Sequence, residues 1–325
     1  MNIKITKAGV LATLQDAGRF GNRSVGIGSG GAMDTIAMKL ANFLVGNKED
    51  ATVIEMHFPA PEILFEQDAI ISLAGADFKA SINEMGLPVY RTAFIKKGTV
   101  LKFSQPISGT RLYMAVHGGW QAQKWLDSYS THLKLTMGGH CGRALKKDDV
   151  IHFSKNNFSF AENTILSWCI SQHELDNIYE PSNKIRCIKG IEYDLMDDPS
   201  KQKLEQNKFI ISNQSDRMGY RLTGNTISLH QQTESISSAV DAGIVQLLPD
   251  GNCIVLMADH QTTGGYPRIA SVIKTDLPKL LQAKPGQPVN FTIISLQQAE
   301  DAFIALQKKL NDVKAGCHLK LEKYL

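Results

Sequence analysis

The sequence has little cysteine, no long apolar run and almost no excess of charge of either sign. Its five cysteines are scattered, odd in number and never spaced as C-x-x-C, which excludes a disulfide framework and an all-cysteine zinc site. No apolar run approaches the roughly 18 residues of a membrane span, and the first residues lack the apolar core of a signal peptide. The 35 Lys and Arg against 32 Asp and Glu give no reason to expect nucleic acid or a membrane as partner. We therefore predict a cytoplasmic protein with reduced thiols.

Signature motifs of catalysis are also missing. The nine histidines include no H-E-x-x-H, so we predict no metal site. Ser29 is not a nucleophile elbow, because Ile27 stands where G-x-S-x-G requires glycine. Lys39 sits in a tetrapeptide like that of a biotinylated lysine, but its neighbours have helical spacing. We predict an ordinary helix-face lysine and no biotin attached to this chain.

Glycine, in contrast, is abundant at 26 of 325 residues, which favours tight turns and close backbone approach. Strand signals dominate and recur at the spacing of a sandwich or barrel. Helical periodicity is confined to 33–45, 277–283 and 295–313, the last opened by a Ser295 and Gln298 capping box. The fold prediction is mainly β with few helices, its strands lying at 52–58, 62–65, 69–74, 78–82, 99–103, 111–116, 185–188, 208–211, 243–248, 253–257 and 289–294.

The length of 325 residues suggests about two domains. Between the two groups of strands, 154–183 is polar and contains Asn156-Asn157 and Pro181-Ser182-Asn183, so we expect the boundary there. The predicted domains are 1–184, an N-terminal β domain plus linker, and 185–325, a C-terminal β domain ending in a helix.

Gly26, Gly28 and Gly31 satisfy G-x-G-x-x-G, and a helix is expected to follow. A dinucleotide fingerprint needs a strand running into the glycines and alternating strands and helices after them, which this sequence lacks. Free N–H groups at the start of the helix near Met33 remain a possible anion site, and a tight turn without ligand is the alternative.

Four polar clusters are set among glycines. The last of them combines glutamine, two threonines, tyrosine and arginine around a Gly-Gly pair, which suits carboxylate, carbonyl or phosphate groups. The alternative is a polar loop that satisfies only its own backbone. The clusters lie at 15–19, 31–34, 216–222 and 259–268.

At these clusters the sequence resembles the C subunits of bacterial ATP-dependent 5-oxoprolinases. Their family also includes allophanate hydrolase subunit 2, an antagonist of a sporulation-kinase inhibitor, and half of the urea amidolyase carboxyltransferase domain. The resemblance extends from about residue 3 to about residue 299. It is carried by Gly9, Thr13-Leu14-Gln15-Asp16, Gly18-Arg19, Gly31-Ala32-Met33-Asp34, Leu73-Ala74-Gly75-Ala76, Ala115-Val116-His117-Gly118-Gly119, Ser130-Thr131, Gly138-Gly139, Gly142-Arg143, 215–222, Leu256-Met257, Asp259 and 261–270.

The resemblance implies two cyclophilin-like β-barrel domains and an obligate B subunit that completes a composite site, together with an A subunit. The implied reaction opens 5-oxo-L-proline to L-glutamate with hydrolysis of ATP, supplied with Mg²⁺. Charge builds on a phosphoryl group and an oxyanion, so cationic and N–H donors are expected in the site. No nucleic acid, membrane or protein-bound metal is implied.

Site roles follow as hypotheses. The expected catalytic residues are Arg217, Gln261 and Arg268, with both arginines binding anions. Asp16 or Asp34 is expected to orient an arginine or to hold Mg²⁺ with ATP. The expected substrate- or anion-binding residues are Gln15, Asp16, Arg19, Asp34, Thr262, Thr263 and Tyr266.

Two other activities within the same family stay open. One is a carboxyltransferase half of a urea carboxylase and allophanate system, which would require a biotinylated carrier. The other is a regulatory antagonist of a kinase inhibitor, which would bind a partner without catalysis.

Overall fold

The computed structural model describes residues 1–154, 158–179, 182–230 and 236–324, and the chain divides into two compact units. Unit 1 contains Met1–Arg19, Gly30–Leu175 and Lys309–Leu325. Unit 2 contains Phe20–Ser29 and Asp176–Lys308. The short segment that follows Arg19 thus belongs with residues that are far away in sequence. The domain bounds 1–184 and 185–325 stay a prediction.

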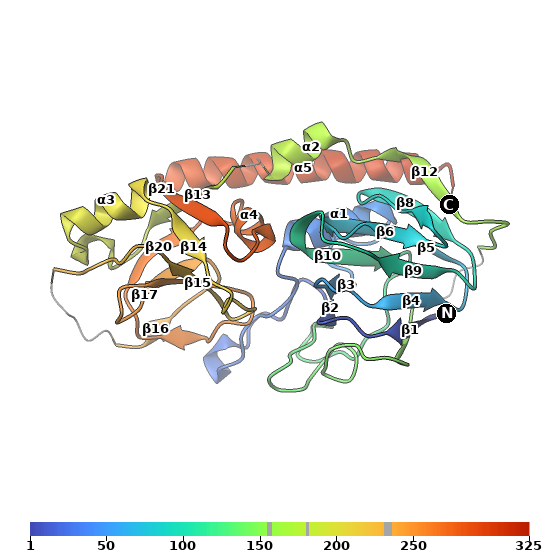
Figure 1. Cartoon of the computed structure of the whole chain (residues 1–325), viewed down its shortest axis with the longest axis horizontal. Coiled ribbons are helices and arrows are strands. Elements are labelled where there is room, and N and C mark those ends of the chain that lie inside the picture. Colours follow the sequence, from blue (N-terminus) through green and yellow to red (C-terminus); the bar gives the residue numbers. More distant parts are fainter. Residues whose placement is uncertain (155–157, 180–181, 231–235, 325) are drawn as a thin grey trace. The chain divides into compact units, whose positions relative to one another are not determined.

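Unit 1 is built on two six-stranded sheets (Figure 1). Buried side chains of both sheets form one hydrophobic core, because strands such as β1 alternate inward and outward residues. The first sheet has the order β11(Val150–His152), β1(Asn2–Lys7), β4(Glu62–Phe65), β9(Val100–Phe103), β6(Ala80–Ile82), β7(Met85–Gly86). The second has the order β12(Thr164–Cys169), β8(Arg91–Ile95), β5(Ala69–Asp77), β10(Ser108–Val116), β3(Val53–Met56), β2(Ala12–Gln15).

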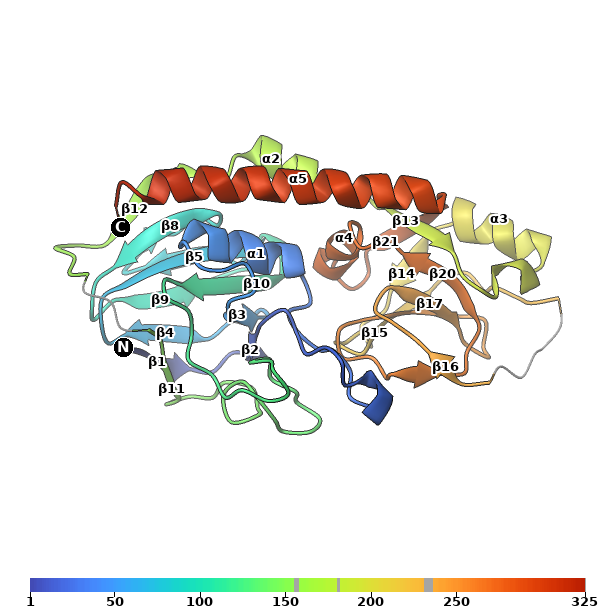
Figure 2. The same cartoon turned by 180° about the vertical axis from the view of Figure 1, so that it is seen from behind.

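Helix α1 (Thr35–Leu44) contacts β5 and β10 of the second sheet (Figure 2). Two buried hydroxyls of that sheet satisfy carbonyls in the last turns of the helix. Ser72 Oγ donates to the carbonyl of Ala41 at 2.6 Å, and Thr92 Oγ1 donates to that of Leu44 at 2.5 Å. The burial of these two hydroxyls is therefore explained by carbonyls that the end of the helix leaves without partners.

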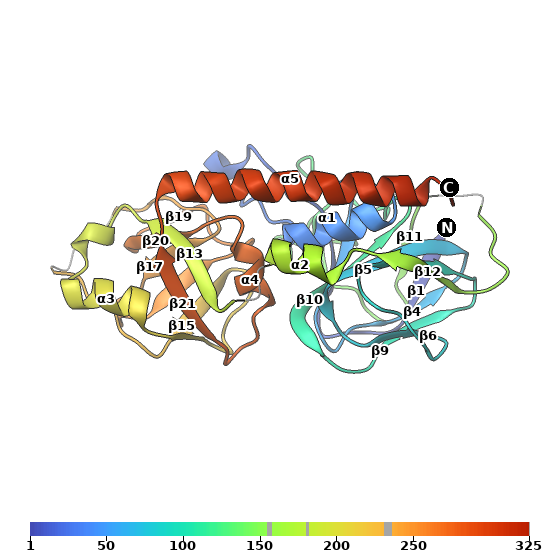
Figure 3. The same cartoon turned by 90° about the horizontal axis from the view of Figure 1, so that it is seen from above.

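Unit 2 is a closed seven-stranded barrel, in which all pairs are antiparallel except β13 with β21. These two strands lie side by side in Figure 3. Closure pairs every strand on both sides and leaves no open edge. Its order is β13(Lys184–Lys189), β20(Arg268–Val272), β17(Ile244–Leu247), β18(Cys253–Leu256), β15(Gly219–Thr223), β14(Phe209–Ile211), β21(Pro288–Ile293). The unit also contains η1(Arg23–Val25), η2(Tyr193–Leu195), α3(Asp198–Gln206), α4(Leu277–Gln282) and the ribbon β16(Ser238–Ala239) with β19(Thr263–Gly264).

Helix α5 (Leu296–Leu321) begins at the predicted capping box: Ser295 N donates to Gln298 Oε1 at 2.9 Å, and Gln298 N to Ser295 Oγ at 3.2 Å. Its residues through Lys308 belong to unit 2 and the rest to unit 1. No described helix is long and apolar enough to cross a membrane.

The mainly β prediction is confirmed, and each expected strand and helix overlaps an observed one. The family resemblance implied two β-barrels. The described strands of unit 1 instead form two open sheets, and those of unit 2 close into a barrel. The expected linker at 154–183 contains β12 and α2 (Gln172–Tyr179). Strand β12 is an edge strand that buries only Leu166, so the sequence there lacks the alternation of apolar and polar residues that predicts a strand. Asn156-Asn157 and Pro181 of that stretch lie outside the described residues.

Candidate functional site

The 259–268 loop of unit 2 contains most of the predicted catalytic residues, and an arginine–carboxylate pair holds its first residue. Arg217 is 6% exposed, and its Nε and Nη2 donate to Oδ2 and Oδ1 of Asp259 at 2.7 and 3.0 Å. The backbone N–H of Asp259 also donates to the carbonyl of Arg217 at 2.8 Å. The guanidinium charge of Arg217 is therefore matched within the chain.

A second pair holds the other end of the loop. Arg268 donates from Nε and Nη2 to the two oxygens of Glu192 at 3.0 and 2.7 Å, and its backbone N–H donates to the same carboxylate at 2.8 Å. Burial acts to raise the pKa of Glu192, but the hydrogen bonds from Arg268 outweigh it and the pKa is lowered. The hydrogen bond to Glu192 raises the pKa of Arg268. Nη1 of Arg268 donates no hydrogen bond within the part of the chain that the structure describes.

Between these pairs the loop presents groups that a ligand can reach. Gln261 and Thr263 are exposed, Thr262 is half-buried and Tyr266 is 45% exposed. Thr263 pairs with Ala239 in the β16–β19 ribbon, which keeps the loop extended there. The loop thus presents one carboxamide, two hydroxyls and a phenol, and an arginine–carboxylate ion pair holds each of its ends.

The same loop contains a buried histidine that hydrogen-bonds its backbone. His260 is 3% exposed and its Nδ1 donates to the carbonyl of Gln261 at 2.5 Å, while Nε2 lies 3.7 Å from Asp241 Oδ1. Arg23, from the segment Phe20–Ser29, lies 3.4 Å from Asp241 and donates to the carbonyl of Val240. Contact with His260 and the charge of Arg23 lower the pKa of Asp241 to about 2. The members of this cluster are far apart along the chain, so no sequence pattern marks it.

In unit 1, Asp16 organises a loop. Its Oδ1 accepts from the N–H of Gly18 at 2.8 Å, from Ser128 Oγ at 2.7 Å and from Ser130 Oγ at 2.5 Å, and its Oδ2 accepts from the N–H of Tyr129 at 2.5 Å. This buried carboxylate is therefore engaged by four donors of the chain itself. The adjacency of Ser130 and Asp16 could not be derived from their spacing in the sequence.

The neighbours of Asp16 are buried as well. Arg19 is 1% exposed, donates from Nη2 to the carbonyl of Ser130 at 2.6 Å and lies over the ring of Trp125, its Cζ 4.8 Å from the ring centroid. Gln15 is fully buried and donates to Thr13 Oγ1 at 3.0 Å. Both side chains pack inside unit 1.

Asp34 is the N-cap of α1. Its Oδ1 accepts from the N–H groups of Ile36 and Ala37 at 3.1 and 2.9 Å, so these donors are already satisfied and do not form the anion site considered above. The N–H of Asp34 donates to the Tyr113 hydroxyl, which donates to Glu55 at 2.9 Å. Burial and the nearby Glu55 raise the pKa of Tyr113 well above its usual value.

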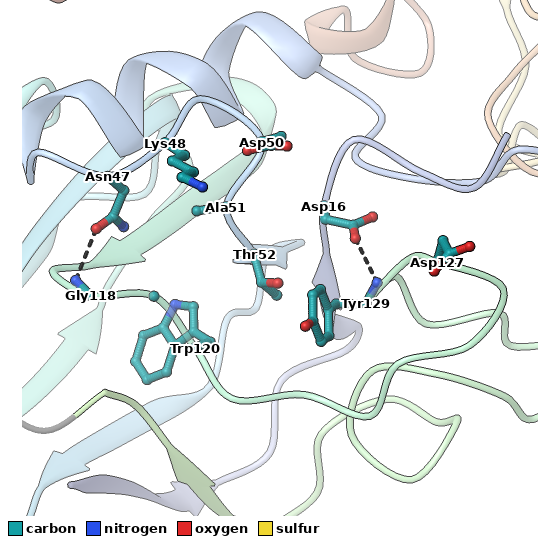
Figure 4. Close-up of a pocket in the computed structure, with 11 residues that line it drawn as sticks. Asp16, Asn47, Lys48, Asp50, Ala51, Thr52, Gly118, Trp120, Asp127 and Tyr129 are labelled. Carbon is teal, nitrogen blue, oxygen red and sulfur yellow. Dashed lines mark hydrogen bonds between the residues drawn. The ribbon is translucent and has the colours of Figure 1, made fainter.

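Unit 1 also contains a pocket of about 510 Å³. Figure 4 shows the loop after α1 on one side, with Asn47 accepting from the N–H of Gly118 at 2.9 Å, and Asp16 with Tyr129 on the other. Three carboxylates and one lysine line it, which disfavours an anion. Its lining residues are Asp16, Asn47, Lys48, Asp50, Ala51, Thr52, Gly118, Gly119, Trp120, Asp127 and Tyr129.

Among the described residues, no group of three or more His, Cys, Asp or Glu is placed to hold a metal ion. The carboxylates of Asp16 and Asp34 accept hydrogen bonds from chain donors, so neither offers Mg²⁺ a ready ligand set. Lys39 lies in the middle of α1 and pairs with Glu49 at 3.1 Å.

The predicted site residues thus fall into two groups. Gln15, Asp16, Arg19 and Asp34 belong to unit 1, and Arg217, Gln261, Thr262, Thr263, Tyr266 and Arg268 to unit 2. Within each unit the structure gathers them around one loop system or helix start. Three side chains that contact the 259–268 loop or its supporting histidine were not predicted, because no local motif marks them: Glu192, Asp241 and Arg23.

Comparison with known families identifies the class of protein. The model of the carboxyltransferase domain, subdomain A and B, matches residues 25–293. A structure of Kluyveromyces lactis urea carboxylase has the same fold, with a TM-score of 0.88 at 22% identity over 97% of this chain and 29% of that one. The chain belongs to the carboxyltransferase subdomain A and B family.

Within that family the similarity is more specific. The chain is 35% identical over 288 residues to the 5-oxoprolinase C subunit of Haemophilus influenzae, covering 89% of this chain and 90% of the relative. It is 36% identical over 297 residues to the 5-oxoprolinase C subunit of Escherichia coli K12, covering 91% and 93%. The chain is a homologue of the 5-oxoprolinase C subunits, as the resemblance predicted.

Proposed function

We propose that this chain is the C subunit of an ATP-dependent 5-oxoprolinase, which converts 5-oxo-L-proline to L-glutamate together with A and B subunits. The observation that carries the proposal is the 35–36% identity to two such subunits over about nine tenths of the chain. Both units are then expected to be cyclophilin-like β domains of a cytoplasmic complex, although only unit 2 closes its barrel.

Opening the lactam of 5-oxoproline requires groups that stabilise developing negative charge. Resonance makes the lactam amide a poor electrophile, and phosphorylation of its oxygen by ATP would make it a better one. Charge then develops on the phosphoryl group and on the oxyanion of the ring-opening step, where preorganised donors lower the barrier most. The complex would use ATP with Mg²⁺ and would need no biotin on this chain.

The unit 2 loop supplies donors of this kind. Gln261, Thr262 and Thr263 would hydrogen-bond the lactam or phosphate, and Tyr266 would form a pocket wall. Arg217 and Arg268 act from fixed positions, because each is held by a bidentate carboxylate. Nη1 of Arg268 is the donor that we assign to developing negative charge.

The predicted site residues of unit 1 hold local structure within their own unit. Asp16 and Arg19 shape the loop around Ser128 and Ser130, and Asp34 fixes the start of α1. We assign Mg²⁺ to the ATP phosphates and to groups outside this chain, because the carboxylates of unit 1 are already engaged.

The test is reconstitution. Expressed with its A and B partners, the chain should support 5-oxoproline-dependent ATP hydrolysis and glutamate formation only when all three subunits are present. Activity that requires urea and a biotinylated carrier would instead establish the carboxyltransferase alternative. Binding that changes the activity of a kinase without turnover would establish the regulatory alternative.

A further inference from the structure

The barrel of unit 2 buries one side-chain amide that makes no hydrogen bond with the described residues. Gln246, in β17, is fully buried, and neither its amide nitrogen nor its amide oxygen has a hydrogen-bond partner in the part of the chain that the structure describes. Burying a carboxamide without partners costs stability, so a group of this kind calls for an explanation.

The surroundings of Gln246 connect it to the predicted site. A Cβ placed on Gly264 would lie 2.6 Å from Gln246 Nε2 and 3.4 Å from Gln261 Nε2. Two carboxamides therefore converge beside the backbone of Gly264, one buried and the other exposed to solvent. A side chain at position 264 would enter the space beside both amides and displace that of Gln246.

Strand register places the same residue next to the predicted catalytic arginine. Gln246 is opposite Arg268 in the β17–β20 pair, at a β-bulge that follows Val245. Bulges of this type re-aim side chains and are common beside active sites. Gln246 is thus adjacent to two residues of the 259–268 loop, Gly264 and Arg268.

We propose that Gln246 is the residue that recognises the lactam. A five-membered lactam holds its N–H and C=O on the same side, so one side-chain carboxamide can accept from the N–H and donate to the oxygen at once. A donor and an acceptor in one side-chain amide, both without a partner among the described residues, are what such a cyclic cis-amide requires. This inference rests on the proposed function, because the lactam is its substrate.

The same pair of hydrogen bonds would make the site select 5-oxoproline over glutamate and over a lactone. Glutamate, the ring-opened product, lacks the cis-amide and cannot make both hydrogen bonds. A lactone with oxygen in place of the ring nitrogen offers no N–H to Gln246 Oε1. A site whose buried polar groups are left unpaired by an analogue rejects that analogue strongly.

The variant that tests this role is Gln246→Met in the reconstituted three-subunit complex, because methionine has similar length but no hydrogen-bonding group. We expect KM for 5-oxoproline to rise about 10-fold or more, as for loss of one or two hydrogen bonds, while KM for ATP changes less than about twofold. The purified chain should unfold at an equal or higher temperature, because an unpaired amide has been removed. Gln202→Met, on the exposed face of α3, is the matched control and should change neither value.

A second measurement separates recognition from packing. The wild-type complex should bind 5-oxoproline at least about 10-fold more tightly than the corresponding lactone, and Gln246→Met should bring the two affinities together. Gln246→Glu, which accepts from N–H but cannot donate to C=O when ionised, should also raise KM for the lactam.

The outcomes are distinct. If the wild-type complex is active and Gln246→Met keeps its KM and its lactam preference, this inference is overturned and the proposed function stands. If the variant instead unfolds at a lower temperature with an unchanged KM, Gln246 has a structural role, such as binding an internal water. If the wild-type complex has no 5-oxoproline-dependent activity, both proposals are overturned.

Discussion

Arg268 and Glu192 form a bidentate ion pair at the start of β20, and the same carboxylate also accepts the backbone N–H of Arg268. The side chains are only 17% and 15% exposed, so neither charge is well solvated alone. The pair can therefore serve both to fix the loop and to present the remaining guanidinium nitrogen to a ligand.

Arg268→Ala should abolish activity of the reconstituted complex and lower the free energy of unfolding by roughly 2 to 3 kcal/mol, because Glu192 is left without its partner. The double variant Arg268→Met with Glu192→Met should recover most of that stability, since it removes both charges, yet stay inactive. Denaturant unfolding and ATP hydrolysis measure the two effects. Recovery of activity in the double variant would show that Arg268 only holds the fold.

The stability of unit 1 should fall at low pH because of Asp149. Bidentate hydrogen bonds from Arg143 at 2.7 and 2.8 Å lower its pKa from 3.8 to about 2. A lowered pKa stabilises the folded state above the unfolded pKa, and this stability is lost as the pH falls through the folded value. We expect Asp149→Asn to cost about 1 to 2 kcal/mol at pH 6, with a difference from wild type that shrinks toward pH 2.

Denaturant unfolding across that pH range measures the effect of Asp149. Asp312→Asn, an exposed carboxylate of α5, is the control and should cost little at any pH. A difference between Asp149→Asn and wild type that stays constant from pH 6 to pH 2 would contradict the linkage.

Asp34 should behave as a helix cap. Asp34→Ala is expected to lower the free energy of unfolding by about 1 to 2 kcal/mol, because the N–H groups of Ile36 and Ala37 lose their acceptor. Asp34→Asn retains a capping oxygen and should restore most of the stability and the activity. A stable but inactive Asp34→Asn would instead mean that the charge of Asp34 acts on substrate or Mg²⁺.

Gly264→Ala should damage the site without unfolding the chain. Its Cβ would lie 2.6 Å from Nε2 of the buried Gln246, so that amide has to shift, whereas the backbone of Gly264 does not adopt a positive φ and is not strained by a side chain. We expect an overpacking cost of about 1 to 3 kcal/mol, which lowers the unfolding temperature by a few degrees, together with a rise in KM for 5-oxoproline. Gly86→Ala, whose Cβ meets nothing within 4 Å, is the control and should leave KM unchanged.

Much of the fold was predictable because its signals are local. The capping box at Ser295 and Gln298 and the strands in both units follow from residue types at fixed spacings. Strand β12 and helix α2 were missed because they lie in a polar stretch and bury few side chains. Whether a group of strands closes into a barrel depends on pairing between its first and last strands, which periodicity does not contain.

The sequence by itself determined the strand-rich class, the main helices and the family, because propensity, capping and ordered motifs are written in neighbouring residues. Only the tertiary structure decided which polar residues are already satisfied and which are not. Asp16, Asp34 and Arg268 looked alike as charged residues among glycines, yet Asp16 and Asp34 turned out to bond the chain's own donors and Arg268 to pair with Glu192. No motif in the sequence marked Gln246, because the burial of its amide without a hydrogen-bond partner results from the packing of strands and loops that are distant in sequence.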